Sequence, residues 1–252
     1  MKRIESTQNA QVKAWKKLAQ LRKEREKMGE YMIEGFHLVE EALKHKTQIL
    51  HLIVTEGVDL PLLWDIDDIQ IVTVTEAVAK ELAETEKTQG VFAHLRQVEH
   101  TEIEMAAWKK FLFVDAVQDP GNIGTMIRTA DAAGIDAVIL GKGTADLYNA
   151  KTLRSAQGSH FHIPVVRGEL DEWVERVQDD GIRVYGTALE EAVPFTDVQT
   201  DGKFALIMGN EGSGISPQLL AKTDQNVIIP LKGQAESLNV AVATGILLYA
   251  FS

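Results

Sequence analysis

Cysteine is absent from this chain of 252 residues, which excludes several kinds of chemistry. Without a thiol the protein has no disulfide, no iron–sulfur cluster, no thiolate zinc site and no cysteine nucleophile. Long apolar runs are also missing. The longest, residues 238–251, is interrupted by Asn239, Thr244 and Gly245 and falls short of the ~18 residues of a membrane span. Since no apolar run follows Met1, no signal peptide is expected. The sequence predicts a cytoplasmic protein that does not associate with a membrane.

An excess of positive charge is lacking too, because the formal net charge is −11. That value is against a general attraction to nucleic acid. The charge is unevenly spread, however: residues 1–27, here called the basic arm, hold nine lysines and arginines against three glutamates. Local charge decides phosphate contacts, so this arm could follow an RNA backbone. The alternative is a solvated helix surface with ion pairs one turn apart, such as Arg22 with Glu26.

The first 95 residues have the pattern of a small α/β unit. Apolar periodicity predicts a helix over 9–27, with Trp15, Leu18 and Leu21 on one stripe. A second helix follows Gly35, and a third runs from Thr75, its N-cap, to about residue 83. Strands are expected at 31–34, 49–55, 69–74 and 91–95. Residues 96–109 are polar and charged, which is typical of a linker or a linking helix.

From residue 110 onward, short apolar runs with little polar alternation indicate parallel strands covered on both faces. These strands are expected at 111–117, 137–140, 163–166, 182–187, 204–208 and 227–231. Helices are expected between several of them, at 122–134, 170–179 and 215–222. The alternation predicts an α/β fold with a parallel sheet. Ligands in such folds bind at the loops that follow the strands, and three of these loops are unusual.

The first loop, residues 119–125, reads Asp-Pro-Gly-Asn-Ile-Gly-Thr and leads to Arg128. Pro-Gly makes a turn, and Asn122 is a candidate helix cap. Arg128 falls opposite the apolar stripe of the following helix. It is either a surface arginine paired with Asp131 or a guanidinium that grips a phosphate or carboxylate near the loop.

The second loop, residues 209–214, reads Gly-Asn-Glu-Gly-Ser-Gly and follows an apolar strand. It is neither of the two common phosphate-binding fingerprints, although its exposed N–H groups could hold a ligand. A plain connecting turn is the alternative. Glu211 would repel a phosphate.

The third loop, residues 232–237, leads into a helix that is apolar nearly all round, which predicts a buried helix. Ser237 and Asn239 are the polar groups at its start. Ser237 is expected to be the N-cap, a role compatible with ligand contact.

Two other signals are weak. His160 and His162 could pair on a metal, but no third ligand is placed to complete a site, so no metal is expected. The nucleophile elbow of serine hydrolases is absent.

Together the three loops resemble the SpoU branch of the SPOUT-class RNA 2′-O-ribose methyltransferases. The resemblance rests on residues 115–134, 204–216 and 227–243, in this order and each after a strand, and on the Arg-Ser stretch of 151–164. More weakly, residues 1–95 resemble the family's L30e-like substrate-binding domain. The resemblance covers about 110–252 and implies a deep trefoil knot in that domain and a homodimer formed through it. The domains expected are therefore 1–95 for RNA, 96–109 as linker and 110–252 for methyl transfer.

The resemblance also implies a cofactor, S-adenosylmethionine, bent between the second and third loops. Its contacts would be Ala188, Gly209, Ile229 and Leu238. The catalytic cluster would be Asn122, Arg128, Glu211, Ser237 and Asn239. Because arginine stays protonated, Arg128 suits a clamp on the neighbouring phosphate and a stabiliser of developing alkoxide better than a base.

The implied activity is methyl transfer to a ribose 2′-hydroxyl, with structured ribosomal RNA favoured over transfer RNA as substrate. Two other functions stay open at this point. One is a non-catalytic RNA-binding factor that uses the basic arm while the second domain only dimerises. The other is a nucleotide-binding enzyme, which the absence of both phosphate-loop fingerprints disfavours.

Overall fold

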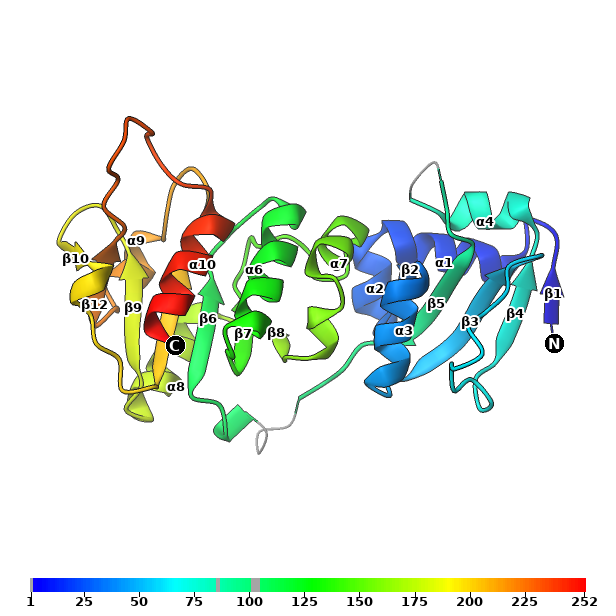
Figure 1. Ribbon diagram of the computed structural model, residues 1–252, viewed down its shortest axis with the longest axis horizontal. Helices are drawn as coiled ribbons and strands as arrows, with labels where there is room; N and C mark the ends of the chain where they lie inside the picture. The colour runs from blue at the N-terminus through cyan, green and yellow to red at the C-terminus, as the bar shows by residue number, and fades with distance from the viewer. Residues whose placement is uncertain (1, 85–86, 101–104) are drawn as a thin grey trace. The chain divides into compact units, whose positions relative to one another are not determined.

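The computed structural model describes residues 2–84, 87–100 and 105–252. It divides into two compact units, each with a sheet and flanking helices (Figure 1). Unit 1 comprises Met1–Glu99 and Tyr148–Phe161, and unit 2 comprises His100–Leu147 and His162–Ser252. The α/β class predicted from the sequence is confirmed. The expected division into contiguous stretches differs from the structure at Tyr148–Phe161, which packs with the N-terminal residues.

Unit 1 is built on a mixed five-stranded sheet in the order β1-β4-β3-β5-β2. The β1–β4 and β3–β4 pairs are parallel, and the β2–β5 and β3–β5 pairs are antiparallel. Its strands are β1 (Lys2–Ile4), β2 (Glu30–Glu34), β3 (Ile49–Thr55), β4 (Ile71–Val74) and β5 (Val91–Arg96). Its helices are α1 (Ala10–Gln20), α2 (Arg22–Met28), α3 (Phe36–Lys44), α4 (Glu76–Leu82) and α7 (Ala150–Ala156), with a 3-10 turn η1 (Ser159–Phe161).

Alternating strand residues give this sheet an apolar core on each face. On one face α1 and α4 cover Ile53 and Phe92, with Trp15 buried between them. On the other face α3 covers Tyr31 and its neighbours, and Leu153 of α7 joins the same core. That contact explains why α7 belongs to unit 1, and local periodicity contains no signal for it.

The helix predicted over 9–27 is in fact two helices, because the chain is extended at Leu21 (φ −113°, ψ 111°). Leu21 is 48% exposed, so its expected place on the buried stripe is wrong. Arg25 explains the break. Its guanidinium is buried and donates to the carbonyls of Leu18 and Ala19 at 2.6 and 2.8 Å, satisfying the last turn of α1. Arg25 is therefore a structural member of the basic arm.

Unit 2 contains a seven-stranded sheet in the order β10-β12-β9-β11-β6-β7-β8, and every strand pair is parallel. The predicted parallel sheet is confirmed. Its strands are β6 (Lys110–Val114), β7 (Ala137–Leu140), β8 (Val165–Arg167), β9 (Arg183–Thr187), β10 (Ala192–Pro194), β11 (Phe204–Met208) and β12 (Gln225–Ile228). Its helices are α6 (Pro120–Ala132), α8 (Leu170–Asp179), α9 (Pro217–Leu220) and α10 (Val240–Phe251), with a 3-10 turn η2 (Phe195–Asp197).

Helices α8 and α9 pack on the sheet face that carries Phe111 and Phe113. Trp108 joins this core and stacks on Trp173 at 6.3 Å, so the C-terminal end of the expected linker is anchored in unit 2. Residues 101–104 of that linker lie outside the described residues.

Helices α6 and α10 lie side by side (Figure 1) and contact strands β7 and β11. The prediction that α10 is buried on all sides is wrong for the single chain. Leu247 and Leu248 are buried, whereas Val242, Ile246 and Tyr249 are 52%, 36% and 63% exposed. No helix in the described part of the chain is long and apolar enough to cross a bilayer.

Candidate active site

The loop between β6 and α6 is shaped by Asp119. Its carboxylate accepts hydrogen bonds from the N–H groups of Gly121 and Asn122, and Pro120 occupies the first helical position. Asp119 is thus the N-cap, and the expectation that Asn122 caps this helix is wrong. Because it is relieved of capping, the Asn122 amide is free to reach the other two loops.

Glu211, from the loop after β11, closes over the start of α6. Its carboxylate accepts from the N–H groups of Gln118 and Asp119, each at 3.1 Å, and from Asn122 Nδ2 at 3.0 Å. Burial raises the pKa of Glu211, but these hydrogen bonds outweigh it and leave the pKa below its usual value. Glu211 is therefore ionised at neutral pH, and its hydrogen bonds join the first loop to the second.

Asn239 brings in the third loop. Its Oδ1 caps α10 by accepting from the N–H groups of Ala241 and Val242 at 2.9 and 3.3 Å. Its Nδ2 donates to Asn122 Oδ1 at 3.0 Å. A continuous hydrogen-bonded chain therefore runs Glu211–Asn122–Asn239, here called the amide chain. The predicted N-cap at Ser237 is wrong, since Asn239 fills that position, and Ser237 is exposed.

The second loop is held tightly at both ends. A Cβ atom at Gly209 would lie 2.2 Å from the backbone of Gly214 and Ile215, so only glycine fits. Asn210 Oδ1 accepts from the N–H groups of Gly212 and Ser213 at 2.9 and 3.1 Å. Its Nδ2 donates to the Ala116 carbonyl at 2.8 Å, which ties this loop to the first one.

The backbone of the third loop has N–H and carbonyl groups that are available to a ligand. Within the described residues, the main-chain groups of 229–238 form no hydrogen bonds with the rest of the chain. Ile229 is half-buried, and Leu238 is 37% exposed. Ala188 follows β9 beside this loop and donates its N–H to the Val227 carbonyl at 3.2 Å. Free amide groups next to apolar side chains form a surface that suits a partly apolar ligand with polar edges.

Arg128 is exposed on α6, and within the part of the chain that the structure describes its guanidinium has no partner. The alternative pairing with Asp131 is wrong, because Asp131 accepts from His162 Nδ1 at 2.7 Å. Arg128 is therefore available to an anion from outside the chain.

The structure thus joins Asn122, Glu211 and Asn239 directly, whereas Arg128 and Ser237 form no hydrogen bond with them. Three supporting residues were missed by sequence reasoning: Asp119, Asn210, and Asp115, whose carboxylate accepts from the Ser216 N–H at 2.7 Å. Only Asp119 had a readable signal, an acidic cap before proline. The other two act on backbone far away in the sequence.

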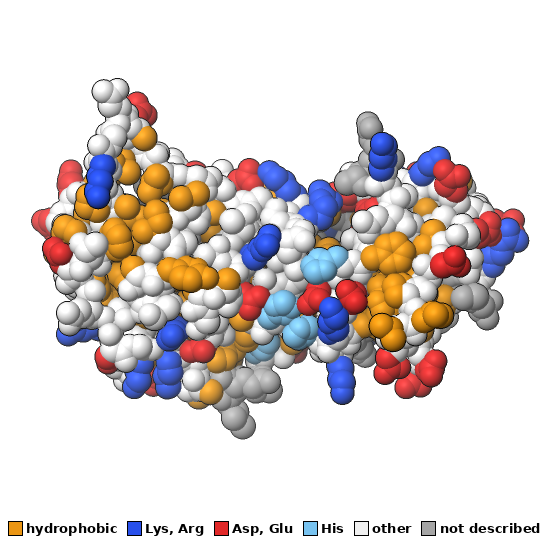
Figure 2. Space-filling model, viewed as in Figure 1, with side chains coloured by type: hydrophobic (Ala, Val, Ile, Leu, Met, Phe, Trp, Pro, Cys, Tyr) orange, Lys and Arg blue, Asp and Glu red, His pale blue; other side chains and the backbone are white. Residues whose placement is uncertain are grey.

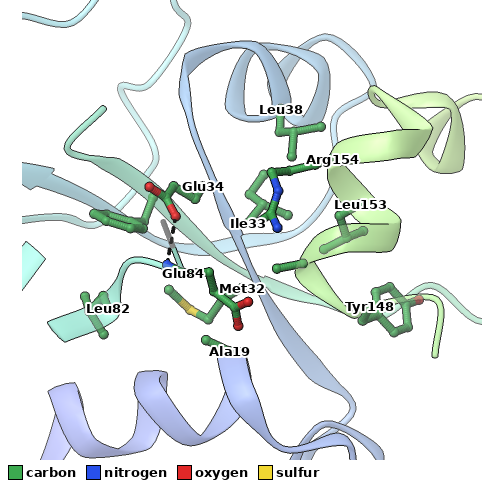
Figure 3. A pocket seen from close by; sticks show the side chains of 12 residues that line it. Ala19, Met32, Ile33, Glu34, Leu38, Leu82, Glu84, Tyr148, Leu153 and Arg154 are labelled. Atoms are coloured by element: carbon green, nitrogen blue, oxygen red, sulfur yellow. Dashed lines mark hydrogen bonds between the residues drawn. The ribbon is translucent and has the colours of Figure 1, made fainter. Parts of the chain in front are cut away.

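The Arg-Ser stretch lines a small cavity in unit 1 (Figure 3). Tyr148, Leu153 and Arg154 line it together with Met32 and other residues of the sheet and helices. Its volume of about 30 Å³ is the size of a single water. At this cavity the Arg-Ser stretch therefore contributes packing.

Comparison with known proteins also divides the chain in two, although the C-terminal match includes the segment Tyr148–Phe161 of unit 1. The sequence profile of the SpoU rRNA Methylase family matches residues 109–249, and that of the MRM3-like substrate binding domain matches residues 9–93. The first match contains all three loops, and the second lies within unit 1.

Similar proteins extend over nearly the whole chain. The 23S rRNA (guanosine(2553)-2′-O)-methyltransferase RlmP of Bacillus subtilis (strain 168) is 52% identical over 99% of this chain and 98% of its own. The AdoMet-bound rRNA methyltransferase of Sinorhizobium meliloti has a TM-score of 0.87 at 31% identity, covering 99% of this chain and 96% of that one. The SpoU methyltransferase AviRb of Streptomyces viridochromogenes, in complex with AdoMet, has a TM-score of 0.86 at 28% identity, covering 96% and 97%. With its three loops gathered by the amide chain, this protein belongs to the SpoU rRNA methylase family.

Proposed function

We propose that this protein transfers a methyl group from S-adenosylmethionine to a ribose 2′-hydroxyl of 23S ribosomal RNA. The observation that carries the proposal is the amide chain, which joins three distant loops of a SpoU domain at one edge of a parallel sheet. A connecting turn needs no such bracing. The rRNA target is supported by the 52% identity to RlmP over 99% of the chain, and the cytoplasm is where such a substrate is found.

The loops fit the cofactor chemically. Ile229 and Leu238 offer apolar surface for an adenine ring, and the unbonded backbone of 229–238 offers donors and acceptors for its edges. Gly209 allows the chain to turn back tightly, and Ala188 adds little bulk nearby. When bound, S-adenosylmethionine supplies an electrophilic methyl group on a cationic sulfur. The ionised Glu211 is compatible with that cation, whereas it would repel a phosphate.

The chain's own residues then have distinct roles. Methyl transfer is an in-line displacement, so alignment accounts for much of the rate. Asn122, Glu211 and Asn239 fix the loops that hold the two reactants, and Ser237 offers a hydroxyl at the rim of the third loop. Arg128 stays cationic, so it binds the RNA phosphate beside the target ribose and stabilises the alkoxide as the 2′-hydroxyl passes its proton to solvent water.

Unit 1 is proposed to be an L30e-like RNA-binding domain. Its mixed sheet and the match to a substrate-binding domain over 9–93 support this assignment. Lys13 and Lys17 of the basic arm, which have no side-chain partner among the described residues, supply phosphate contacts in an otherwise acidic chain.

Unit 2 is proposed to contain a trefoil knot and to form a homodimer. The knot would explain how α10, from the end of the chain, returns beside α6. The dimer would bury the exposed apolar stripe Val242, Ile246 and Tyr249, which has helical i, i+4, i+7 spacing. Figure 2 shows hydrophobic side chains gathered on the face of unit 2 that carries α10.

Two measurements test the activity. Calorimetry is expected to detect S-adenosylmethionine binding, which a purely RNA-binding protein would not show. For Arg128→Ala we expect methyl transfer to fall about 100-fold with cofactor affinity unchanged, because a preorganised charge at the reacting oxygen is lost. Full methyl transfer by Arg128→Ala with normal RNA binding would refute the assigned role.

A further inference from the structure

A groove lies in unit 1 between α1, α2 and the sheet, with a volume of about 470 Å³. We call it the α1 groove. It is lined by Ala10, Gln11, Lys13, Ala14, Trp15, Lys17, Leu18, Glu24, Met28, Glu30, His51 and His94. All these residues belong to unit 1, so the groove is formed within one compact body. It is separate from the three loops of unit 2.

The floor of the groove is a hydrogen-bonded network of Trp15, His94, Glu30, His51 and Gln11. The Trp15 indole can only donate, so His94 Nδ1, 3.3 Å away, is the acceptor. His94 then carries its proton on Nε2 and donates to Glu30 Oε2 at 2.8 Å. His51 Nδ1 lies 3.1 Å from the same His94 nitrogen, and His51 Nε2 lies 3.1 Å from Gln11 Nε2. The bonds to Trp15 and Glu30 hold His94 in one tautomer, and the half-buried His51 ring faces the groove.

The rim of the groove carries unpaired positive charge. Lys13 and Lys17 are exposed, one helical turn apart on α1, and have no partner among the residues that the structure describes. Neighbouring Lys16, in contrast, forms an ion pair with Glu81. Two unpaired like charges at i, i+4 repel each other, and that repulsion is relieved when an anion binds between them.

The interior of the groove carries the opposite charge. Glu30 bonds His94, and the Glu24 carboxylate lines the groove without a partner in the described part of the chain. Carboxylates repel a phosphate but accept from the N–H groups on the edge of a nucleobase. An aromatic imidazole and the exposed Met28 beside them suit the faces of a flat ring.

We propose that the α1 groove holds the base of an unpaired nucleotide of the RNA substrate, with its flanking phosphates on Lys13 and Lys17. The distribution of charge favours a nucleotide over a free anion. The carboxylates keep a phosphate out of the interior of the groove, whereas the lysines bind a phosphate at its rim. The proposal rests on the proposed function only in that the ligand is RNA. It adds that unit 1 selects RNA with an extruded or single-stranded base.

Fluorescence anisotropy with the full-length protein and labelled hexanucleotides tests the proposal. Single strands are expected to bind at least tenfold more tightly than a duplex of the same length. The substitution Ala14→Phe fills the groove from an exposed helical position and should weaken single-strand binding at least tenfold. The control Lys80→Gln, on α4 of the same unit, should leave the affinity for the single strand unchanged.

Two further variants test the contributions of the rim and of the interior of the groove separately. Replacing Lys13 and Lys17 together by glutamine should lower the salt dependence of binding by about 1.4 in log–log slope, the effect of two lost phosphate contacts on a single strand. Glu24→Gln should reduce the preference for adenine or cytosine, which carry an amino group, over uracil. Both variants should retain wild-type affinity for S-adenosylmethionine.

The outcomes also separate this inference from the proposed function. Unchanged single-strand binding by folded Ala14→Phe, or a preference for duplex, would overturn the groove as a base site even if methyl transfer is normal. Absent cofactor binding alongside the expected oligonucleotide results would instead overturn the methyltransferase and leave the groove assignment intact.

Discussion

At the scale of single residues, Gly209 is the position on which the second loop depends most. The chain turns back so closely that a methyl group there would overlap the backbone of Gly214. Gly212, three positions away in the same loop, has room, since a Cβ atom would lie 3.7 Å from Asn210 Oδ1. A side chain is therefore excluded by the neighbouring backbone at Gly209 and is accommodated at Gly212.

We expect Gly209→Ala to lower the free energy of unfolding by about 1–3 kcal/mol, as overpacking does, and to weaken S-adenosylmethionine binding more than tenfold. Gly212→Ala is the matched control and should bind the cofactor nearly as the wild type does. Thermal unfolding and calorimetry measure both effects. Equal cofactor affinity in the two variants would contradict the assigned geometry.

His94 makes the stability of unit 1 depend on pH. Burial lowers its pKa, while the bond to Glu30 acts in the opposite direction. Just below the unfolded-state pKa, the unfolded chain binds a proton that the folded chain does not, so stability is lost as the pH falls below about 6.5. The melting temperature should drop between pH 6.5 and 5, and His94→Gln should flatten that slope. An unchanged slope in the variant would show that other groups are responsible.

At the scale of elements, Asn239 couples helix α10 to the amide chain, because one side-chain oxygen caps the helix while the amide nitrogen bonds Asn122. Asn239→Asp keeps the cap and removes the donor. We expect its melting temperature to stay near wild type and methyl transfer to fall at least tenfold, whereas Asn239→Ala should also lose about 1 kcal/mol of stability. Full activity in Asn239→Asp would mean that only capping matters at this position.

Several elements were predictable to the residue, and others were not. Strands β3, β7 and β11 stand where their apolar runs place them, and Thr75 caps α4 as predicted. Strand β1 was missed, since Lys2–Ile4 has one apolar residue and is stabilised by pairing with the distant β4. The exchange of capping roles from Asn122 to Asp119 and from Ser237 to Asn239 shows that neighbouring polar residues compete for a cap. Asn122 bonds the other two loops without capping α6, whereas Asn239 caps α10 and bonds Asn122 as well, so local sequence does not decide which residue becomes the cap.

At the scale of the whole molecule, the exposed stripe on α10 predicts self-association. Val242→Glu should shift the protein from dimer to monomer in size-exclusion chromatography with light scattering, because a charge in an apolar interface is left unpaired. Leu62→Glu is the control, since Leu62 is fully exposed in unit 1. A wild-type monomer, or a Val242→Glu dimer, would contradict the proposed interface.

The assignment of Tyr148–Phe161 to unit 1 is a feature of the whole molecule that the sequence did not reveal. Leu153 is as apolar as the core residues of unit 2, and only the three-dimensional packing shows that it belongs to the same core as Tyr31 and Ile33. The three site loops were found because their glycines, amides and charges are unusual for connecting turns. Their convergence depends on strand order, which local patterns do not contain.

The central claim is methyl transfer to a ribose of 23S rRNA by the residues of the amide chain. The most direct measurement incubates the purified protein and S-adenosylmethionine with unmodified 23S rRNA and maps 2′-O-methyl groups by resistance to alkaline cleavage. We expect one new resistant position with the wild type and at least tenfold less methylation there with Asn239→Asp. No new position on rRNA or ribosomal subunits, or methylation confined to transfer RNA, would contradict it.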